Sequence, residues 1–383
     1  MLSNALLLRG FDRGEYRVLG EKGDKKVQQI SMFDGSKPLK ITNSIRLIEL
    51  FAGIGSQSKA LENLGADFEH YRVCEFDKYA VKSYNAVHGT NFTTSDIRDL
   101  HAEDLGIVDT DKYTYIMTYS FPCTDLSLAG KQEGMKKGSG TRSGLLWEVE
   151  RLLTELRDRG GQMPQILLCE NVPAIHGAAN KDDFDDWCNF LLSLGYNNKW
   201  QDLNAKDYGI PQNRDRTFMV SWLGDYYYDF PEPKKLKLRL LDMLEEKVAE
   251  KFYIKESGKG KKTSSGLFSI YGGKWDNANE MHRRVYSIEG CCPTLTANAG
   301  GNSEKKVAIE IKDTRNVKCG IWTYKGKCYI VRKIIPIEEW RIMGFLDKDF
   351  HNAANVNSNT RLRMQAGNSI VVNVLMEIFG RML

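Results

Sequence analysis

Residues 47–55 read Leu-Ile-Glu-Leu-Phe-Ala-Gly-Ile-Gly, an apolar run that ends in two closely spaced glycines. The pattern predicts a buried strand over residues 45–51, a tight turn at the glycines, and a helix over residues 56–64 that ends at Gly65. Such a turn lets the backbone approach a ligand, and the helix N-terminus after it favours polar or anionic groups. The third glycine of the dinucleotide-binding pattern is missing, because Ser58 stands at its position.

Similar strand–helix units follow along the first half of the chain. Apolar runs predict strands over residues 71–75, 113–119, 165–169 and 216–222, and amphipathic stretches predict helices over residues 78–87 and 144–158. Repeated units at this spacing favour an α/β fold with a parallel sheet wound with helices.

We expect the chain to divide into three parts. Residues 1–43 are polar and weakly patterned, which predicts a partly ordered extension. Residues 44–223 form the α/β domain, and residues 361–383 complete it through an apolar helix over 368–382. Between these segments, glycine, lysine and aromatic residues mix without a clear period before β-like pieces follow. Residues 224–360 are therefore expected to form a smaller, irregular, β-rich domain.

The composition is that of a soluble globular protein in a reducing compartment. The 383 residues are 42% hydrophobic and 27% charged, and no apolar run approaches the roughly 20 residues that a membrane helix needs. The first residues lack a signal-peptide layout. The eight cysteines form no Cys-x-x-Cys pair or Cys/His cluster, so we expect neither zinc nor a disulfide framework. We expect a cytosolic protein in which a free catalytic thiol is possible.

Positive charge is clustered, although the net charge is only +4. Lysine and arginine gather around residues 131–142, 234–239 and 255–262. Basic residues on flexible segments suit the phosphate backbone of nucleic acid. The alternative is that these clusters are solvent-exposed loops without a binding role, as most runs of charged residues are.

A cysteine and a glutamate each follow an apolar strand. Residues 121–123 read Phe-Pro-Cys after one predicted strand, and residues 170–172 read Glu-Asn-Val after the next. Pro122 fixes the turn, and the polar continuation places Cys123 at an exposed strand end, whereas Cys169 fits core packing. Attack on an electron-poor ring needs such a pair, a thiolate to add and a carboxyl to place a proton opposite.

Further polar residues lie at the ends of predicted strands or on one face of an extended segment. Glu75 can accept hydrogen bonds from ribose hydroxyls, and Asp96 can hold an adenine amino group, so that with the glycine turn they describe a nucleoside pocket. Surface acids are the alternative. Gln212, Arg214 and Arg216 alternate, which puts them on one face of an extended segment where guanidinium groups can bind a base carbonyl or carboxylates. A salt-bridge ladder on an edge strand is the alternative here.

These motifs, in this order, resemble those of the DNA cytosine-5 methyltransferases of the single-chain bacterial or phage type. The six motifs are Phe51-Ala-Gly-Ile-Gly, Phe121-Pro-Cys, Glu170-Asn-Val, Gln212-x-Arg-x-Arg216, Pro293-Thr-Leu-Thr-Ala297 and Gln365-Ala-Gly-Asn-Ser-Ile-Val-Val372. Six motifs in order hardly occur by chance, and the match runs from about Ile45 to the C-terminus. Residues 118–151 are also similar to bacterial CpG methyltransferases.

The resemblance implies a Rossmann-like domain that binds S-adenosylmethionine, without a metal, beside a target-recognition domain. It implies that Glu75 binds the ribose and that Phe76 stacks on the adenine. Asp96 and Ile97 would hold the adenine edge. The residues that it assigns to the pocket are Phe51, Gly53, Gly55, Glu75, Phe76, Asp96, Ile97, Pro122, Leu145, Asn368 and Ser369.

The resemblance also implies methyl transfer to C5 of a cytosine that is flipped out of a specific double-stranded DNA sequence. Cys123 would attack C6 as a thiolate and form a covalent adduct, while Glu170 supports N3 through a proton. Arg216, aided by Arg214, would hold O2. C5 then loses its proton to a base, which we expect to be water, and the cysteine leaves.

The expected DNA contacts are Arg142, Lys131 and Gln212, with residues 130–143 as a mobile loop that closes over DNA. Thr124 stands where the family most often has glutamine, which leaves the local DNA contact open. The target sequence is open as well, because the variable region has no readable code and a CpG target is a guess. So is the existence of a restriction partner.

Other functions and partners remain open. The same domain can methylate cytosine in RNA, as one branch of the family does with tRNA. A nicotinamide oxidoreductase would explain the glycine turn but leave the cysteine, glutamate and arginine without a role. Residues 29–33, Gln-Ile-Ser-Met-Phe, resemble the peptide by which bacterial proteins dock on the replication sliding clamp, with a local packing segment as the alternative. We expect a monomer.

Overall fold

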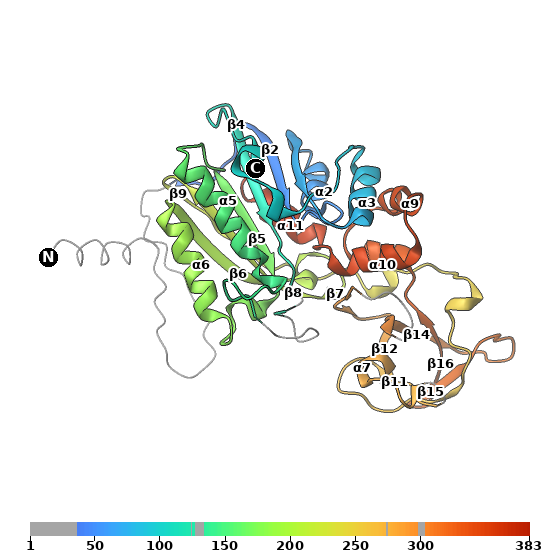
Figure 1. Cartoon of the computed structure of the whole chain (residues 1–383). Coiled ribbons are helices and arrows are strands. Elements are labelled where there is room, and N and C mark those ends of the chain that lie inside the picture. The colour runs from blue at the N-terminus through green and yellow to red at the C-terminus, as the bar shows by residue number, and fades with distance from the viewer. Residues whose placement is uncertain (1–36, 124, 127–133, 273–274, 298–302) are drawn as a thin grey trace.

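The computed structural model describes two lobes, formed by residues 37–123, 125–126, 134–272, 275–297 and 303–383 (Figure 1). The larger lobe contains a sheet covered by helices, and the smaller lobe is built around a second sheet. Thr124, Lys131 and the clamp-like residues 29–33 lie outside the described residues, so the expectations for them stay predictions. Within the described ranges, no helix has both the length and the apolar character needed to cross a bilayer.

Six strands form the sheet of the larger lobe in the order β3-β2-β4-β5-β8-β6. Their bounds are β2 Ser44–Leu50, β3 Phe68–Cys74, β4 Tyr113–Tyr119, β5 Ile166–Asn171, β6 Tyr196–Asn204 and β8 Asp215–Leu223. The strands β3, β2, β4 and β5 run parallel to one another. β8 is antiparallel to both β5 and β6, so the prediction of a parallel sheet is wrong for this strand. The connection from β6 to β8, residues 205–214, is shorter than the roughly dozen residues that a parallel crossover needs.

Helices cover both faces of this sheet. α2 (Ser56–Leu64) and α11 (Val372–Gly380) contact each other on one face, and α5 (Leu146–Asp158) and α6 (Lys181–Ser193) lie on the other. Alternate strand residues face opposite layers, so that in β4 Ile116 packs with the core of α2 and α11, whereas Met117 packs with that of α5 and α6. This arrangement confirms the α/β, Rossmann-like class.

Helix boundaries follow the prediction closely around the glycine turn and less closely at the C-terminus. α2 ends at Gly65, whose φ is 65°, and α3 (Lys78–His88) is one residue longer than expected. The single helix predicted over residues 368–382 is wrong, because α10 (Asn359–Asn368) ends where that helix was to begin and α11 starts at Val372. Ser369 between them is extended, with φ −75° and ψ 165°.

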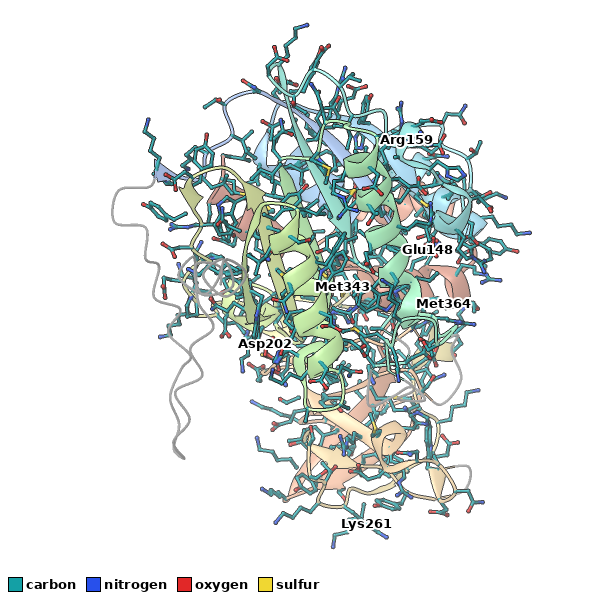
Figure 2. All side chains as sticks on the ribbon, turned by 60° about the vertical axis from the view of Figure 1, so that its left-hand side comes forward. Glu148, Arg159, Asp202, Lys261, Met343 and Met364 are labelled. Atoms are coloured by element: carbon teal, nitrogen blue, oxygen red, sulfur yellow. The ribbon has the colours of Figure 1, made fainter. Side chains whose placement is uncertain are left out.

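The smaller lobe has a sheet in the order β10-β15-β16-β14-β12-β11. The bounds are β10 Gly258–Lys259, β11 Phe268–Ser269, β12 Arg284–Ser287, β14 Lys306–Ile311, β15 Ile321–Tyr324 and β16 Lys327–Lys333. It has its own core, which includes Trp275, Trp322 and Val331. Lys261 lies at the end of this lobe that is far from Glu148 on α5 (Figure 2). The β-rich character expected for this region is confirmed.

The core of the larger lobe extends into the region expected to belong to the smaller domain. α8 (Pro336–Ile342) contacts α10, and α9 (Asp347–Ala354) contacts α3. Leu240 and Trp340 are buried in the same core as α2 and α11. The segments on either side of the smaller lobe therefore pack with the larger one.

Short elements complete the described chain. β1 Lys37–Pro38 pairs with β9 Tyr226–Tyr227, and β7 Gln212–Asn213 pairs with β13 Cys292–Pro293. The short helices are α4 Ala102–Leu105, α7 Glu280–Arg283, η1 Ile97–Asp99, η2 Ser143–Leu145, η3 Pro173–His176, η4 Ala205–Tyr208, η5 Leu240–Met243 and η6 Glu250–Phe252. The β7–β13 pair matters most here, because it joins the motif at residues 293–297 to the larger lobe.

Candidate active site

The candidate site lies beyond the carboxyl ends of β2 and β4. β2 pairs with β3 on one side and with β4 on the other, so the strand order reverses between β2 and β4. Ligands of open α/β sheets bind in the crevice at such a reversal. Phe51 directly follows β2, Glu75 directly follows β3, and Pro122 comes shortly after β4, so the fold brings these three predicted residues to one edge of the sheet.

The turn after β2 contains three residues with positive φ, Phe51 at 59°, Gly53 at 58° and Gly55 at 79°. A Cβ at Gly55 would lie 2.3 Å from Nε2 of His88, so no side chain fits there. A Cβ at Gly53 would meet nothing within 4 Å, so this glycine borders open space. The turn thus offers bare backbone to a ligand.

Glu75 holds this turn from the end of β3. One carboxylate oxygen accepts a hydrogen bond from the N–H of Gly53 at 2.8 Å, and the other accepts one from Asp77 at 2.7 Å. Each oxygen keeps a further lone pair for a hydroxyl group of a ligand. Burial raises the pKa of the Glu75 carboxyl. Phe76 is 74% exposed, which leaves its ring free to stack on a planar group.

Asp96 and Ile97 lie next to the same edge of the sheet. The N–H of Ser95 donates to the carbonyl of Glu75 at 3.0 Å, which ties this segment to the end of β3. Asp96 accepts hydrogen bonds from the backbone N–H and the guanidinium of Arg98, and these bonds hold the pKa of its carboxyl below the usual range. Asp96 is therefore an ionised acceptor, while the side chain of Ile97 is buried.

The other predicted pocket residues differ in exposure. Pro122 and Leu145 are half-buried near Ser143. Asn368 is exposed at the end of α10, whereas Ser369 is buried and its hydroxyl donates to the carbonyl of Ala366 at 2.9 Å. Asn368 can therefore contact a ligand directly, and Ser369 serves the backbone of this segment.

Cys123 is half-buried in the loop after β4, where it packs against the core beneath α5. Burial raises the pKa of its thiol, and the Glu170 carboxylate raises it further. The charges of Arg216 and Arg214 lower the same pKa, so four predicted catalytic groups share one electrostatic environment. Cys169 is buried within β5, in agreement with the packing role predicted for it.

Glu170 and Arg216 face each other across neighbouring strands. Glu170 of β5 lies opposite Phe218 of β8, and Arg216 lies two residues before Phe218 on the same face. Nε of Arg216 is 3.2 Å from Oε1 of Glu170. Burial raises the pKa of Glu170, and the arginine charges oppose that shift. Such a carboxyl carries a proton to higher pH than usual and can give it to a ring nitrogen.

Arg214 is buried between two backbone segments that it joins. Its guanidinium donates to the carbonyl oxygens of Leu295, Gly367 and Ser369 at 2.8, 3.1 and 2.9 Å. Burial lowers the pKa of Arg214 to about 9, so it keeps its charge at neutral pH. Its buried Nε has no hydrogen-bond partner among the described residues. Arg214 is thus a positioning residue with one N–H left for a ligand.

The side chain of Gln212 also forms hydrogen bonds with backbone groups. Its fully buried side chain accepts from the N–H of Leu295 at 3.1 Å and donates to the carbonyl of Ile342 at 3.0 Å. The predicted contact with DNA would require this side chain to leave both partners.

Close packing explains why glycine stands at position 367 in the last motif, because a Cβ there would lie 2.3 Å from the carbonyl carbon of Thr296.

Two residues that received no role from the sequence hold the loop of Cys123. Asn171 donates to the carbonyl of Phe121 at 3.1 Å, and Ser143 donates to the carbonyl of Pro122 at 2.7 Å. Asn171 stands in the Glu-Asn-Val motif, so the sequence could have pointed to a role for this residue. The sequence around Ser143 contains no comparable signal.

Exposed basic residues lie near the site and on the smaller lobe. Arg142 is exposed next to the Ser143 anchor. Lys259, Lys261 and Lys262 are exposed on the smaller lobe. These positions agree with two of the basic clusters seen in the sequence.

Comparisons with known proteins point to one family. The model of the C-5 cytosine-specific DNA methylases matches residues 45–383. The type II methyltransferase M2.ScrFI of Lactococcus lactis subsp. cremoris is 32% identical over 88% of this chain and 98% of its own length. The orphan methyltransferase M.SssI of Spiroplasma monobiae is 32% identical over 90% of this chain and 99% of its own. Among solved structures, the Entamoeba histolytica methyltransferase EhMeth has a TM-score of 0.64 at 16% identity, over 89% of this chain and 98% of that one.

Proposed function

The chain belongs to the C-5 cytosine-specific DNA methylase family and is a DNA cytosine-5 methyltransferase, and we propose how its site carries out the reaction. The observation that carries the proposal is the Glu170–Arg216 ion pair in the electrostatic environment of the Cys123 thiol. Cys123 follows β4, the strand beside β2 and its open glycine turn. Glu170 lies near the end of β5 and Arg216 near the start of β8, which are the next two strands of the sheet. One crevice therefore combines a nucleophile and an acid with a pocket for a nucleoside.

S-adenosylmethionine fits the pocket beside the glycine turn. Gly53 borders open space, and Glu75 keeps lone pairs for the two ribose hydroxyls. The exposed ring of Phe76 suits stacking on adenine, and the ionised Asp96 suits its amino group. When bound, S-adenosylmethionine supplies an electrophilic methyl group.

The protein's own residues activate the cytosine, which is flipped out because its ring is unreachable inside the stack. The Cys123 thiolate forms a bond to C6, and the electrons of the C5–C6 double bond move to C5 while Glu170 gives a proton to N3. Arg216 donates to O2, and the free Nε–H of Arg214 can add to it. After C5 takes the methyl group, it loses its proton to water. The Sγ–C6 bond then breaks, the double bond re-forms, and N3 returns its proton to Glu170.

The smaller lobe is proposed to read the sequence of double-stranded DNA. We place this recognition unit at about residues 254–333, because Leu240 and α8 pack in the core of the larger lobe, whereas Ile254 and Val331 belong to the core of the smaller one. Exposed lysines on this lobe suit phosphate contacts. Arg142 is proposed to bind a phosphate beside the flipped base.

Bisulfite sequencing of plasmid DNA tests this function in a host that lacks cytosine methylation. We expect the wild-type protein to methylate cytosines within one sequence motif and Cys123→Ser to leave the same plasmid unmethylated. Cys188→Ser is the matched control, because Cys188 is buried on α6 and belongs to none of the proposed catalytic, cofactor-binding or DNA-binding residues, and its plasmid should be methylated as in the wild type.

Unmethylated plasmid from a wild-type protein that folds and binds S-adenosylmethionine would contradict DNA as the substrate. The same protein would then be tested on tRNA, which is the alternative acceptor of cytosine methylation. Full methylation by Cys123→Ser would instead contradict the covalent mechanism while leaving the DNA activity in place.

A further inference from the structure

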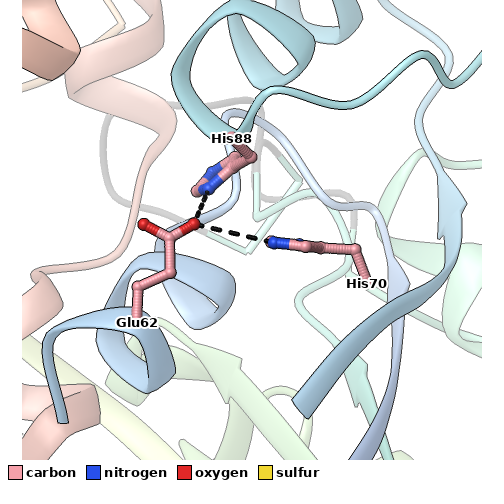
Figure 3. Close-up of side chains that lie close together, drawn as sticks. All are labelled: Glu62, His70 and His88. Carbon is pink, nitrogen blue, oxygen red and sulfur yellow. Dashed lines mark hydrogen bonds and ion pairs between the residues drawn. The ribbon is translucent and has the colours of Figure 1, made fainter. Parts of the chain in front are cut away.

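A glutamate and two histidines meet behind the glycine turn, outside the residues proposed for catalysis (Figure 3). Glu62 comes from α2, His70 from β3, and His88 ends α3. One ligand atom of each residue lies within 4.8 Å of the other two. Nδ1 of His88 is 2.5 Å from Oε1 of Glu62, and Nε2 of His70 is 3.6 Å from the same oxygen. Three elements thus bring three metal-binding side chains to one point.

His70 is oriented through its other ring nitrogen. Nδ1 lies 2.9 Å from the hydroxyl oxygen of Ser58 and 3.1 Å from that of Tyr84. Both hydroxyls donate to Oε2 of the buried Glu49 at 2.5 Å, so they can only accept from His70. Nδ1 therefore carries the hydrogen, and the lone pair of Nε2 points towards Glu62.

His88 is oriented in a similar way. Its Nε2 lies 3.1 Å from the carbonyl oxygen of Ile54, which can only accept a hydrogen bond. Nε2 therefore carries a hydrogen, and Nδ1 is the ring nitrogen that faces Oε1 of Glu62. A metal ion that replaced the proton between Nδ1 of His88 and Oε1 of Glu62 would be bound by one nitrogen of each histidine and by the carboxylate oxygen.

We propose that Glu62, His70 and His88 bind a divalent first-row transition-metal ion such as Zn²⁺ and thereby support the glycine turn from behind. Histidines that bind metals donate their other N–H to a carboxylate, a carbonyl or a similar acceptor, and both histidines do so here. Two imidazoles and one carboxylate suit zinc and its neighbours, whereas Mg²⁺ and Ca²⁺ prefer oxygen ligands. The ion is structural, because His88 contacts the turn through Ile54.

Zinc binding requires a change in the distances within the cluster. Ligands at about 2.0–2.2 Å from zinc lie roughly 3.3–3.6 Å from one another, so the His70–Glu62 distance already fits and the His88–Glu62 contact must open by about 1 Å. The second oxygen of Glu62 accepts from Lys59 at 2.5 Å, which leaves Oε1 alone for the metal. The side chains of His70 and Glu62 are 20% and 28% exposed, so water can reach the fourth position.

Titration of the chelator-treated full chain with Co²⁺ tests the site. Co²⁺ replaces Zn²⁺ and shows its ligands in the visible spectrum. We expect one equivalent to produce the d–d bands of a tetrahedral ion without a thiolate-to-cobalt charge-transfer band, and we expect Zn²⁺ to remove those bands. The absence of d–d bands would show that the cluster is a metal-free ion pair, and a charge-transfer band would place the ion on cysteines. Either result would overturn the proposal.

Two variants and a control locate the ion. His70→Gln and His88→Gln are each expected to lower the affinity for Co²⁺ at least tenfold, as loss of a ligand should. His101→Gln is the matched control, because its side chain is 62% exposed and pairs with Glu155 outside the cluster, and it should leave the titration unchanged. His88→Gln removes a buried contact, so the decisive variant is the partly exposed His70→Gln, checked for folding by circular dichroism. Unchanged Co²⁺ affinity in folded His70→Gln would exclude the site.

Discussion

At the scale of single residues, the proposed chemistry depends on how burial and charge set the protonation of a thiol and a carboxyl. Burial raises the pKa of Cys123 and that of Glu170. The nearby Arg216 charge opposes both shifts, so it favours the thiolate and at the same time limits the pH range in which Glu170 stays protonated. Because the two groups interact, they titrate as a pair, and the arginine sets the balance between nucleophile and acid.

Glu170→Gln tests the transfer of a proton to N3. A carboxyl with a raised pKa keeps its proton below that pKa and loses it as the pH rises, so methyl transfer by the wild type should decline on the alkaline side. The amide has no proton to give, so we expect the single-turnover rate to fall by about 10²–10⁴-fold and the alkaline decline to disappear. Methyl transfer to a cytosine-containing duplex, measured across pH, checks both effects.

Glu69→Gln is the matched control for this change. Glu69 lies near the start of β3, at the end of the sheet opposite the site, and pairs there with Arg46 at 3.2 Å, so its loss should change neither the rate nor the pH profile. If the alkaline decline persisted in Glu170→Gln, another group would be responsible for it, and the proposed role of Glu170 would be refuted.

At the scale of elements, local signals predicted single units well and their pairing less well. The strand, glycine turn and helix at residues 45–65 follow from periodicity and turn chemistry, and they appear where predicted. β6 was missed because its sequence is largely polar, as an edge strand with one unpaired side allows. Without β6, nothing in the sequence indicated that β8 runs antiparallel.

Gly367→Ala tests the contact between α10 and the motif at residues 293–297. A Cβ at this position would lie 2.3 Å from the carbonyl carbon of Thr296 and 2.4 Å from the nitrogen of Ala297, both of which are backbone atoms. We expect the free energy of unfolding to fall by about 1–3 kcal/mol, because the segments must separate. Urea denaturation measures this change. Gly380→Ala is the control, since a Cβ there meets nothing within 4 Å, and equal losses in the two variants would contradict the packing argument.

At the scale of the whole molecule, one chain builds two lobes, of which we propose the larger for catalysis and the smaller for reading the DNA sequence. The larger lobe takes in helices from both ends of the sequence, and the C-terminus returns to it (Figure 1). The smaller lobe has its own core and carries exposed lysines, among them Lys261 at the end that is far from Glu148 (Figure 2). If DNA binds across both lobes as proposed, its affinity should depend on the lysines of the smaller lobe.

Replacement of Lys259, Lys261 and Lys262 by glutamine tests this dependence. Each phosphate contact releases about one counterion, so the slope of log affinity against log salt should decrease in magnitude by up to about 3. Fluorescence anisotropy with a labelled duplex at several salt concentrations measures the slope. Lys112→Gln is the control, because this exposed lysine precedes β4 at the opposite edge of the sheet from the site. An unchanged slope in the triple variant would remove these lysines from the DNA contact.

The sequence by itself determined the family, the strand–turn–helix unit and the placement of Cys123 and Glu170 at strand ends. These features depend on ordered motifs, on hydrophobic periodicity and on turn residues, which act over a few neighbouring positions. Only the tertiary structure decided that Gln212 and Arg214 bind backbone. It also brought Glu62, His70 and His88 together. Such contacts join segments far apart along the chain, and they depend on how the sheet pairs and which helices cover it.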